Sequence, residues 1–149
     1  MPDADIRPAR PDDLTAVLAL YRQLNPADPP PDPACAAAAW AALPSSGLTT
    51  VLVAEQRGRL VSSCTLAIVP NLSRGARPYA VIENVVTDVD HRRRGLGRAV
   101  LKAAQDRAWD AGCYKVLLAT GSKRESTLRF YDGAGFTRDA KTYFEIRRA

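Results

Sequence analysis

The residues best suited to chemistry form one short basic stretch, His91-Arg92-Arg93-Arg94-Gly95-Leu96-Gly97-Arg98. A β-branched segment, AVIENVVTD, precedes it, and an alanine- and leucine-rich segment with helical spacing follows it. A strand that ends at such a loop and leads into a helix exposes unpaired backbone N–H groups at the positive end of the helix dipole. Glycines let a ligand approach the backbone, and arginines add forked cationic donors. The stretch therefore predicts a binding site for a di- or polyphosphate.

Its spacing separates this loop from two other phosphate-binding loops. A P-loop requires Gly-x-x-x-x-Gly-Lys-Ser/Thr and a dinucleotide loop requires Gly-x-Gly-x-x-Gly, but the third glycine position here is Val100. The pattern present is Arg92-x-x-Gly95-x-Gly97, which resembles the acetyl-CoA pyrophosphate loop of the GNAT N-acetyltransferase superfamily, Gln/Arg-x-x-Gly-x-Gly/Ala. A helix start with a solvated basic face gives the same short pattern, so the surrounding elements must decide.

Composition limits the class of protein. A chain of 149 residues with 46% hydrophobic content predicts one domain over residues 1–149. A net charge of +5 suits a polyanionic partner, whether nucleic acid, an anionic membrane or a phosphorylated cofactor. Three widely spaced cysteines without a Cys-x-x-Cys pair indicate neither a disulfide framework nor a zinc site. Without a leader or an apolar run of about 18 residues, we expect a cytoplasmic protein that does not cross a membrane.

The elements that must position the loop follow from hydrophobic spacing. The first half predicts a short strand over 5–9, an amphipathic helix capped by Asp12, an exposed proline loop over 25–33, and a helix from Ala34 behind Asp32. A hairpin over 49–55 and 60–69, a loop over 70–78 and a central strand over 79–88 come next.

The second half predicts a helix from the glycine loop to about Gly112, a strand over 114–120, a capping box at Ser122 and Glu125 before a short helix, and two terminal β-like runs over 136–146. This order predicts an α/β (α+β) fold with a mixed, mainly antiparallel sheet and helices on both faces. It matches the GNAT fold, which implies about six to seven strands and about four helices. The late segment FYDGAGF, with Phe130-Tyr131 and Gly135-Phe136, resembles a second motif of that family.

The resemblance implies acetyl-CoA as the acetyl donor and no metal. In that family the central strand splays away from its neighbour, so backbone groups of Val85, Val86 and Thr87 are expected to pair with the pantetheine arm and the acetyl oxygen. The pyrophosphate is expected to lie on the loop and its arginines, which comprise Arg92, Arg93, Arg94, Gly95, Leu96, Gly97 and Arg98. Arg124 stands where the family often has a CoA-contacting Asn, so we expect it to meet a phosphate instead.

The resemblance also implies two catalytic residues. Tyr131 matches the tyrosine that faces the CoA sulfur and protonates the departing thiolate, and a phenol with an ordinary pKa of about 10 can serve as this acid. Glu83 is the one acidic residue inside the central strand, and simple alternation places it with Val85 and Thr87. We expect Glu83 to take the ammonium proton of the acceptor, although an exposed or ion-paired strand residue would fit the sequence as well.

The function implied is an N-acetyltransferase in which a primary amine attacks acetyl-CoA directly. The acceptor is a small molecule, such as an amino sugar or amino acid, or a peptide. The segments Gly112–Val116 and Ile82–Asn84 resemble the glucosamine-6-phosphate branch of the family, and Arg74 and Arg77 are candidates for an anionic substrate or simply solvated.

Two other functions stay open at this point: a basic nucleic-acid-binding domain using Arg92 to Arg94, and a CoA-binding regulatory domain without catalysis. An aromatic content of 7% disfavours the nucleic-acid hypothesis, because single-strand binding needs aromatic stacking platforms. Glu83 and Tyr131 disfavour the inactive domain. Dimerisation is common in the family, so the terminal strands make a homodimer possible.

Overall fold

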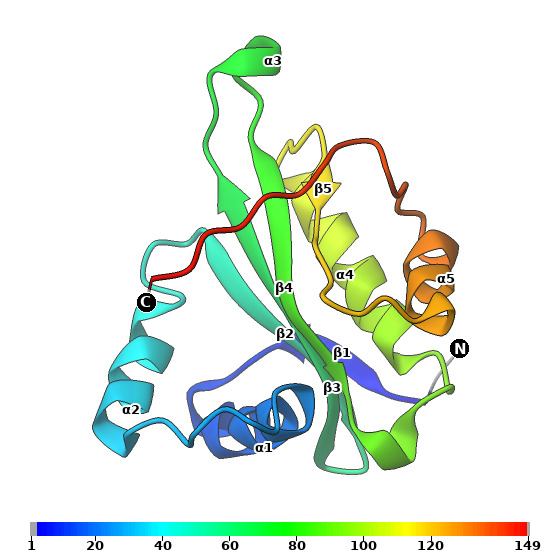
Figure 1. Ribbon diagram of the computed structural model, residues 1–149. Helices are drawn as coiled ribbons and strands as arrows, with labels where there is room; N and C mark the ends of the chain where they lie inside the picture. Colours follow the sequence, from blue (N-terminus) through cyan, green and yellow to red (C-terminus); the bar gives the residue numbers. More distant parts are fainter. Residues whose placement is uncertain (1–2, 149) are drawn as a thin grey trace.

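A computed structural model describes residues 3–148 and is organised around one twisted sheet (Figure 1). The sheet has the order β1-β2-β3-β4-β5, with antiparallel pairs from β1 to β4 and a parallel pair between β4 and β5. Its strands are β1 (Asp5–Pro8), β2 (Thr49–Gln56), β3 (Arg59–Val69), β4 (Tyr79–Thr87) and β5 (Val116–Leu117). The predicted mixed, mainly antiparallel sheet is confirmed, but it has five strands rather than six to seven.

Helices cover both faces of the sheet, as predicted. They are α1 (Leu14–Leu24), α2 (Pro33–Ala42), the short α3 (Ser73–Ala76), α4 (Leu96–Asp110) and α5 (Glu125–Gly133), with single 3₁₀ turns η1 (Pro11–Asp13) and η2 (Val89–His91). The described residues thus form five α-helices, one more than the four or so expected. Helix α1 lies against β3 and β4 on one face, and α4 lies against β2, β3 and β4 on the other (Figure 1).

The core divides into two layers because strand side chains alternate between the faces. Leu52 and Ala54 of β2 pack with the buried side of α4, whereas Val51 and Val53 pack with Val17 of α1. Strands buried on both faces read as continuous apolar runs, which is the pattern TVLVA over this strand. The two layers pack the central strand β4 between α1 and α4.

Two of the predicted helix starts can be compared directly with the structure. Helix α1 is preceded by η1, and Asp13 rather than Asp12 is the organising acid there: its Oδ2 accepts hydrogen bonds from the Arg10 N–H (2.7 Å) and from Arg7 Nη1 (2.7 Å). Helix α2 begins at Pro33, one residue before the predicted Ala34, and Asp32 caps it, since its Oδ2 accepts a hydrogen bond from the Cys35 N–H at 3.0 Å.

The capping box predicted at Ser122 and Glu125 is wrong. Helix α5 begins at Glu125 with Arg124 as its N-cap and no side-chain cap. The Ser122 hydroxyl instead accepts from the Arg124 N–H and bonds to Thr127, while Glu125 pairs with Arg138 at 3.4 Å. A loop that leaves the sheet edge, rather than a turn tight enough for a box, leads into this helix.

The terminal β-like runs predicted over 136–146 are not strands, and the strand predicted over 114–120 shortens to Val116–Leu117. The final segment is extended and crosses in front of the sheet from α5 towards α2 (Figure 1). Its apolar side chains are largely in solvent, with Tyr143, Phe144 and Ile146 exposed by 66%, 86% and 98%. An extended segment becomes a strand only when another backbone pairs with it, and residues 3–148 supply none here.

Candidate active site

A β-bulge in the middle of β4 shapes the site. Ser63 of β3 pairs with Val86 of β4, and Thr65 pairs with Glu83. Two residue positions along β3 therefore correspond to three along β4, so β4 contains one extra residue. The extra residue is Asn84, which has a left-handed φ of 54°. Asn adopts this conformation more readily than most residues do.

The bulge corrects the predicted facing of Glu83. Ile82 and Val85 both pack against the α4 layer although they are three residues apart, while Val86 packs in the α1 layer. Glu83 therefore shares the α1 face with its cross-strand partner Thr65, opposite Val85 and Thr87. Simple alternation fails here because one inserted residue reverses every side chain beyond it.

Strands β4 and β5 separate below their short pairing. Only Ala80–Val116 and Val81–Leu117 are paired, so among the described residues β4 has no strand beside it on that edge from Ile82 onwards. Val85, Val86 and Thr87 lie along this open edge. The opening leaves backbone N–H and C=O groups available to an extended ligand, in the manner of an added strand.

The basic loop forms a tight turn into α4. Arg93 and Gly95 have left-handed φ values of 62° and 77°, and α4 then runs for 15 residues from Leu96. No hydrogen bond within residues 3–148 uses the N–H of Arg93, Arg94 or Gly95 as a donor. These free donors at the N-terminus of a long helix make an anion-binding site, which is the arrangement the sequence predicts.

Two residues of the loop also contribute to the packing of α4. A Cβ at Gly97 would lie 3.1 Å from Thr87 Oγ1 and 3.2 Å from Phe130 Cζ, so this glycine lets α4 pack closely on β4 and α5. The guanidinium of Arg98 lies over Gly133 of α5 rather than over the loop. Gly95 has nothing within 4 Å of its Cβ position, so its requirement is conformational.

Tyr131 lies on α5 beside the open edge of β4. Its ring makes edge contacts with Phe130 (5.0 Å between centroids) and Phe136 (6.3 Å), and it packs against the α4 layer. The pKa of the Tyr131 phenol is raised, chiefly by burial and further by Cys64 and the Glu83 carboxylate. The phenol therefore stays protonated at neutral pH and can donate.

The two predicted catalytic residues approach the edge from opposite faces. Tyr131 belongs to the α4 layer and Glu83 to the α1 face, yet the Glu83 charge still raises the pKa of Tyr131. A ligand in the opening between β4 and β5 would thus have an acid on one side and a carboxylate on the other. Burial raises the pKa of the nearby Cys64 thiol to about 12, so it is no nucleophile, and it packs as a small apolar residue as predicted.

Tyr21 is a candidate site residue that the sequence analysis missed. Its place among the apolar residues of α1 predicts only a packing role, but its hydroxyl lies 3.3 Å from Thr65 Oγ1, opposite Glu83. Burial is the main cause of its raised pKa, and the side chains of Thr65 and Asn84 partly offset that rise. The sequence did contain a signal for this contact, because a buried tyrosine hydroxyl needs a polar partner and a leucine would be enough for packing alone.

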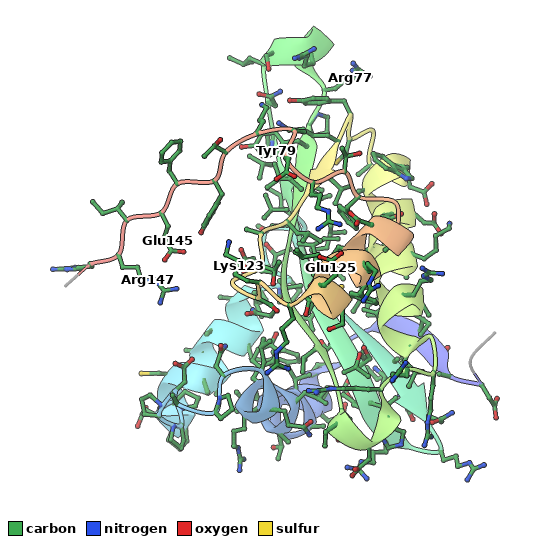
Figure 2. The ribbon with its side chains drawn as sticks, turned by 45° about the vertical axis from the view of Figure 1, so that its right-hand side comes forward. Arg77, Tyr79, Lys123, Glu125, Glu145 and Arg147 are labelled. Atoms are coloured by element: carbon green, nitrogen blue, oxygen red, sulfur yellow. The ribbon has the colours of Figure 1, made fainter. Side chains whose placement is uncertain are left out.

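A second group of cations lies at the outer end of the β3–β4 connection. Lys115 Nζ is 5.3 Å from the ring centroids of both Tyr79 and Tyr114, and the guanidinium carbons of Arg74 and Arg77 are 5.9 and 5.6 Å from Tyr114. Figure 2 shows Arg77 at this end, above Tyr79. None of the three cations has an ion-pair partner in the described part of the chain.

The connection that carries these arginines is held in a strained turn. Arg74, Gly75 and Ala76 are all left-handed, with φ of 57°, 73° and 58°. The Asn71 side chain ties the turn together by donating to the carbonyl oxygens of Ser73 (3.2 Å) and Arg77 (3.1 Å). The left-handed conformation costs about 1–2 kcal/mol at each non-glycine residue, so this turn presents the arginines at a cost in stability.

Arg124, the predicted phosphate contact outside the basic loop, lies on the surface. It is the N-cap residue of α5, between Lys123 and Glu125, which Figure 2 labels. Within residues 3–148, no cluster of His, Cys, Asp and Glu side chains has the makings of a metal site. None of the helices described is both long and apolar enough to span a membrane.

Comparison with known proteins agrees with this geometry. Glucosamine 6-phosphate N-acetyltransferase of Trypanosoma brucei brucei is 34% identical over 134 residues, which are 90% of this chain and 89% of that protein. A solved structure from Agrobacterium tumefaciens strain C58, described as a putative acetyltransferase, superposes with a TM-score of 0.92 at 46% identity and covers 97% of this chain and 99% of its own.

A solved aminoglycoside N-acetyltransferase in complex with CoA has the same fold, with a TM-score of 0.81 at 18% identity over 100% of this chain and 97% of its own. The profile of the Acetyltransferase (GNAT) family matches residues 17–136. Given a bulged central strand that parts from its neighbour, a basic loop at the start of α4 and this match, the chain belongs to the GNAT acetyltransferase family.

Proposed function

We propose that residues 1–149 form one catalytic domain in which a primary amine attacks the thioester of acetyl-CoA directly. The observation that carries the proposal is the opening between β4 and β5, with free loop N–H groups at one end and Tyr131 and Glu83 on its two sides. Val85 to Thr87 would pair with the pantetheine arm, and Arg92 to Arg98 would surround the pyrophosphate. Arg124 is a further candidate for a phosphate contact from the exposed start of α5.

The reaction assigns one proton transfer to each side chain. The acceptor enters as an ammonium ion, and Glu83 on the α1 face removes its proton, directly or through a water molecule. The neutral amine attacks the carbonyl carbon, and backbone N–H groups on the open edge of β4 stabilise the oxyanion. As the carbon–sulfur bond breaks, Tyr131 donates its proton to the thiolate, and the attacking nitrogen gives its second proton, directly or through water, to the tyrosinate as the amide forms. Glu83 then releases its proton to solvent.

The acceptor we propose is a small amine that carries an anionic group, such as an amino sugar phosphate. The three cations around Tyr114 support this class, because unpaired like charges repel one another until an anion neutralises them. The trypanosomal relative named above also acts, by its name, on glucosamine 6-phosphate. The test compares kcat/KM for glucosamine and glucosamine 6-phosphate.

Arg77→Ala and Lys115→Ala should each lower kcat/KM about tenfold for the phosphorylated amine alone. Lys102→Ala serves as the control, since this exposed α4 cation is already paired with Asp106. Equal losses with both amines would show that the cations act on the fold rather than on an anionic acceptor.

Titration calorimetry with acetyl-CoA, dephospho-CoA and a short DNA duplex tests the cofactor site. Gly95→Asp puts a carboxylate in the loop and should weaken acetyl-CoA binding at least tenfold, on the order expected for an opposed charge. Gly58→Asp is the matched control, because Gly58 has the same φ of 77° and the same empty Cβ surroundings in the β2–β3 turn. Salt-dependent DNA binding without acetyl-CoA binding would instead favour the nucleic-acid alternative, and binding without turnover the regulatory one.

A homodimer is also proposed, on the basis of the C-terminal segment. Phe144 and Ile146 alternate with polar residues on an extended, unpaired backbone and are almost fully exposed. Glu145 and Arg147 project from the same segment beside them (Figure 2). A second copy could pair with this backbone and cover its apolar side.

The three cysteines of the chain are free thiols, which supports the cytoplasm as the compartment of this protein.

A further inference from the structure

One buried carboxylate holds the turn between β4 and the cofactor loop. Asp88 is only 3% exposed and follows β4 directly. Its Oδ1 accepts a hydrogen bond from the Asp90 N–H at 3.0 Å and lies 2.9 Å from His91 Nδ1. Its Oδ2 accepts from Gln23 Nε2 at 3.0 Å and from Arg59 at 3.3 Å. Every partner except the Asp90 N–H is a side chain, and those of Gln23 and Arg59 come from outside the turn.

Gln23 contacts the turn through both atoms of its amide. While its Nε2 donates to Asp88, its Oε1 accepts a hydrogen bond from the Val89 N–H at 2.9 Å. Gln23 belongs to the last turn of α1, so the end of this helix is bound to η2 through two adjacent groups. A side chain with a donor and an acceptor on one planar group is needed for this pairing.

The network ends where the loop begins. His91 immediately precedes Arg92, and Arg92 Nε donates back to the Thr87 carbonyl oxygen at 3.2 Å. At the other end, Leu96 and Gly97 are buried in the packing of α4. The direction of the free N–H groups between these ends is therefore set by two anchors, of which the Asp88 network is one.

We propose that Gln23 and Asp88 are positioning residues that fix the loop in the conformation that receives the pyrophosphate of acetyl-CoA. The inference rests on the cofactor site proposed above. The same helix carries Tyr21, whose hydroxyl lies beside Thr65 on the acceptor side of the bulge. Helix α1 thus connects the acceptor side of the site to the cofactor loop through its last turn.

The test exchanges the two groups of the pair. Gln23→Glu brings a carboxylate against the Asp88 carboxylate, and Asp88→Asn brings an amide against the Gln23 amide. In the double variant the carboxylate and the amide have changed places, so the new amide at position 88 can donate to the new carboxylate at position 23. That carboxylate can still accept from the Val89 N–H. Gln56→Met is the control, because the Gln56 amide also donates a hydrogen bond, but to the backbone oxygen of Asp3 and not to Asp88.

Calorimetry with acetyl-CoA, run well below each melting temperature, gives the readout. We expect each single variant to bind about tenfold more weakly, and the double variant and Gln56→Met to bind within about threefold of wild type. Should a single variant fail to fold, Gln23→Met and the double variant carry the same comparison.

Single variants that bind like wild type, or a double variant as weak as the singles, would overturn the inference. A purely structural role would lower the melting temperature without this pattern of loss and rescue. Wild-type protein that does not bind acetyl-CoA would refute the cofactor site itself, which is a separate outcome.

Discussion

Replacing Tyr131 with phenylalanine removes one hydroxyl and leaves the ring contacts in place. Phenylalanine can keep the edge contacts of 5.0 Å with Phe130 and 6.3 Å with Phe136. No hydrogen bond within residues 3–148 involves the Tyr131 hydroxyl, so we expect the free energy of unfolding to change by less than about 1 kcal/mol. Any large effect of Tyr131→Phe must therefore come from chemistry.

That effect should be a loss of kcat on the order of 100-fold, because a positioned general acid contributes roughly 10²- to 10⁴-fold. The assay follows thiol release from acetyl-CoA with the best acceptor from an amine panel, beside the acetyl-CoA dissociation constant, which should not change. Since burial keeps the pKa of Tyr131 above its ordinary value, the wild-type rate should not fall between about pH 7 and 9 through ionisation of this group.

Tyr143→Phe is the matched control. Its phenol is 66% exposed and donates to Glu145 on the same segment, so the rate should stay within about twofold of wild type. A Tyr131→Phe enzyme with more than about a third of the wild-type kcat would refute the acid role. A large loss in Tyr143→Phe would transfer that role to the C-terminal segment.

Three further outcomes follow from the packing and the charges. Gly97→Ala should destabilise by about 1–3 kcal/mol in thermal or urea unfolding, because its Cβ meets Thr87 and Phe130, whereas Gly95→Ala should cost about 1 kcal/mol through backbone conformation alone. The hydrogen bond with His91 is the first cause of the lowered pKa of Asp88, which is about 2. Asp88 therefore contributes about 2 kcal/mol to the free energy of unfolding above about pH 4, and this contribution is lost as the pH falls towards 2. Asp88→Asn should flatten the dependence of the free energy of unfolding on pH in this range. Phe144→Ser with Ile146→Ser should convert a dimer to monomers in light scattering, and an unchanged mass would refute the role of the segment.

The sequence alone was sufficient for the order of the elements from β1 to α5 apart from the short helix α3, and for the glycine turn that opens α4. These features depend on local rules: a glycine with left-handed φ at the start of a helix, apolar residues at helical spacing, and β-branched runs between turns. Gly95 and α4 follow such rules directly, and the structure has both.

Only the tertiary structure decided which way the residues of β4 face. The inserted residue at Asn84 has no signal in the sequence, since it depends on how β3 pairs with β4, and it moves Glu83 to the face of α1. The role of Gly97 likewise depends on Thr87 and Phe130, which are distant in the chain.

The same distinction accounts for the C-terminal segment and for Gln23. Alternating residues over 142–146 favour a strand, but a strand exists only where another backbone accepts its hydrogen bonds. Gln23 reads as a polar residue of α1, and its contact with Asp88 spans 65 positions of sequence. Local spacing therefore determined what each segment can form, whereas pairing between distant segments decided which side chains share the site.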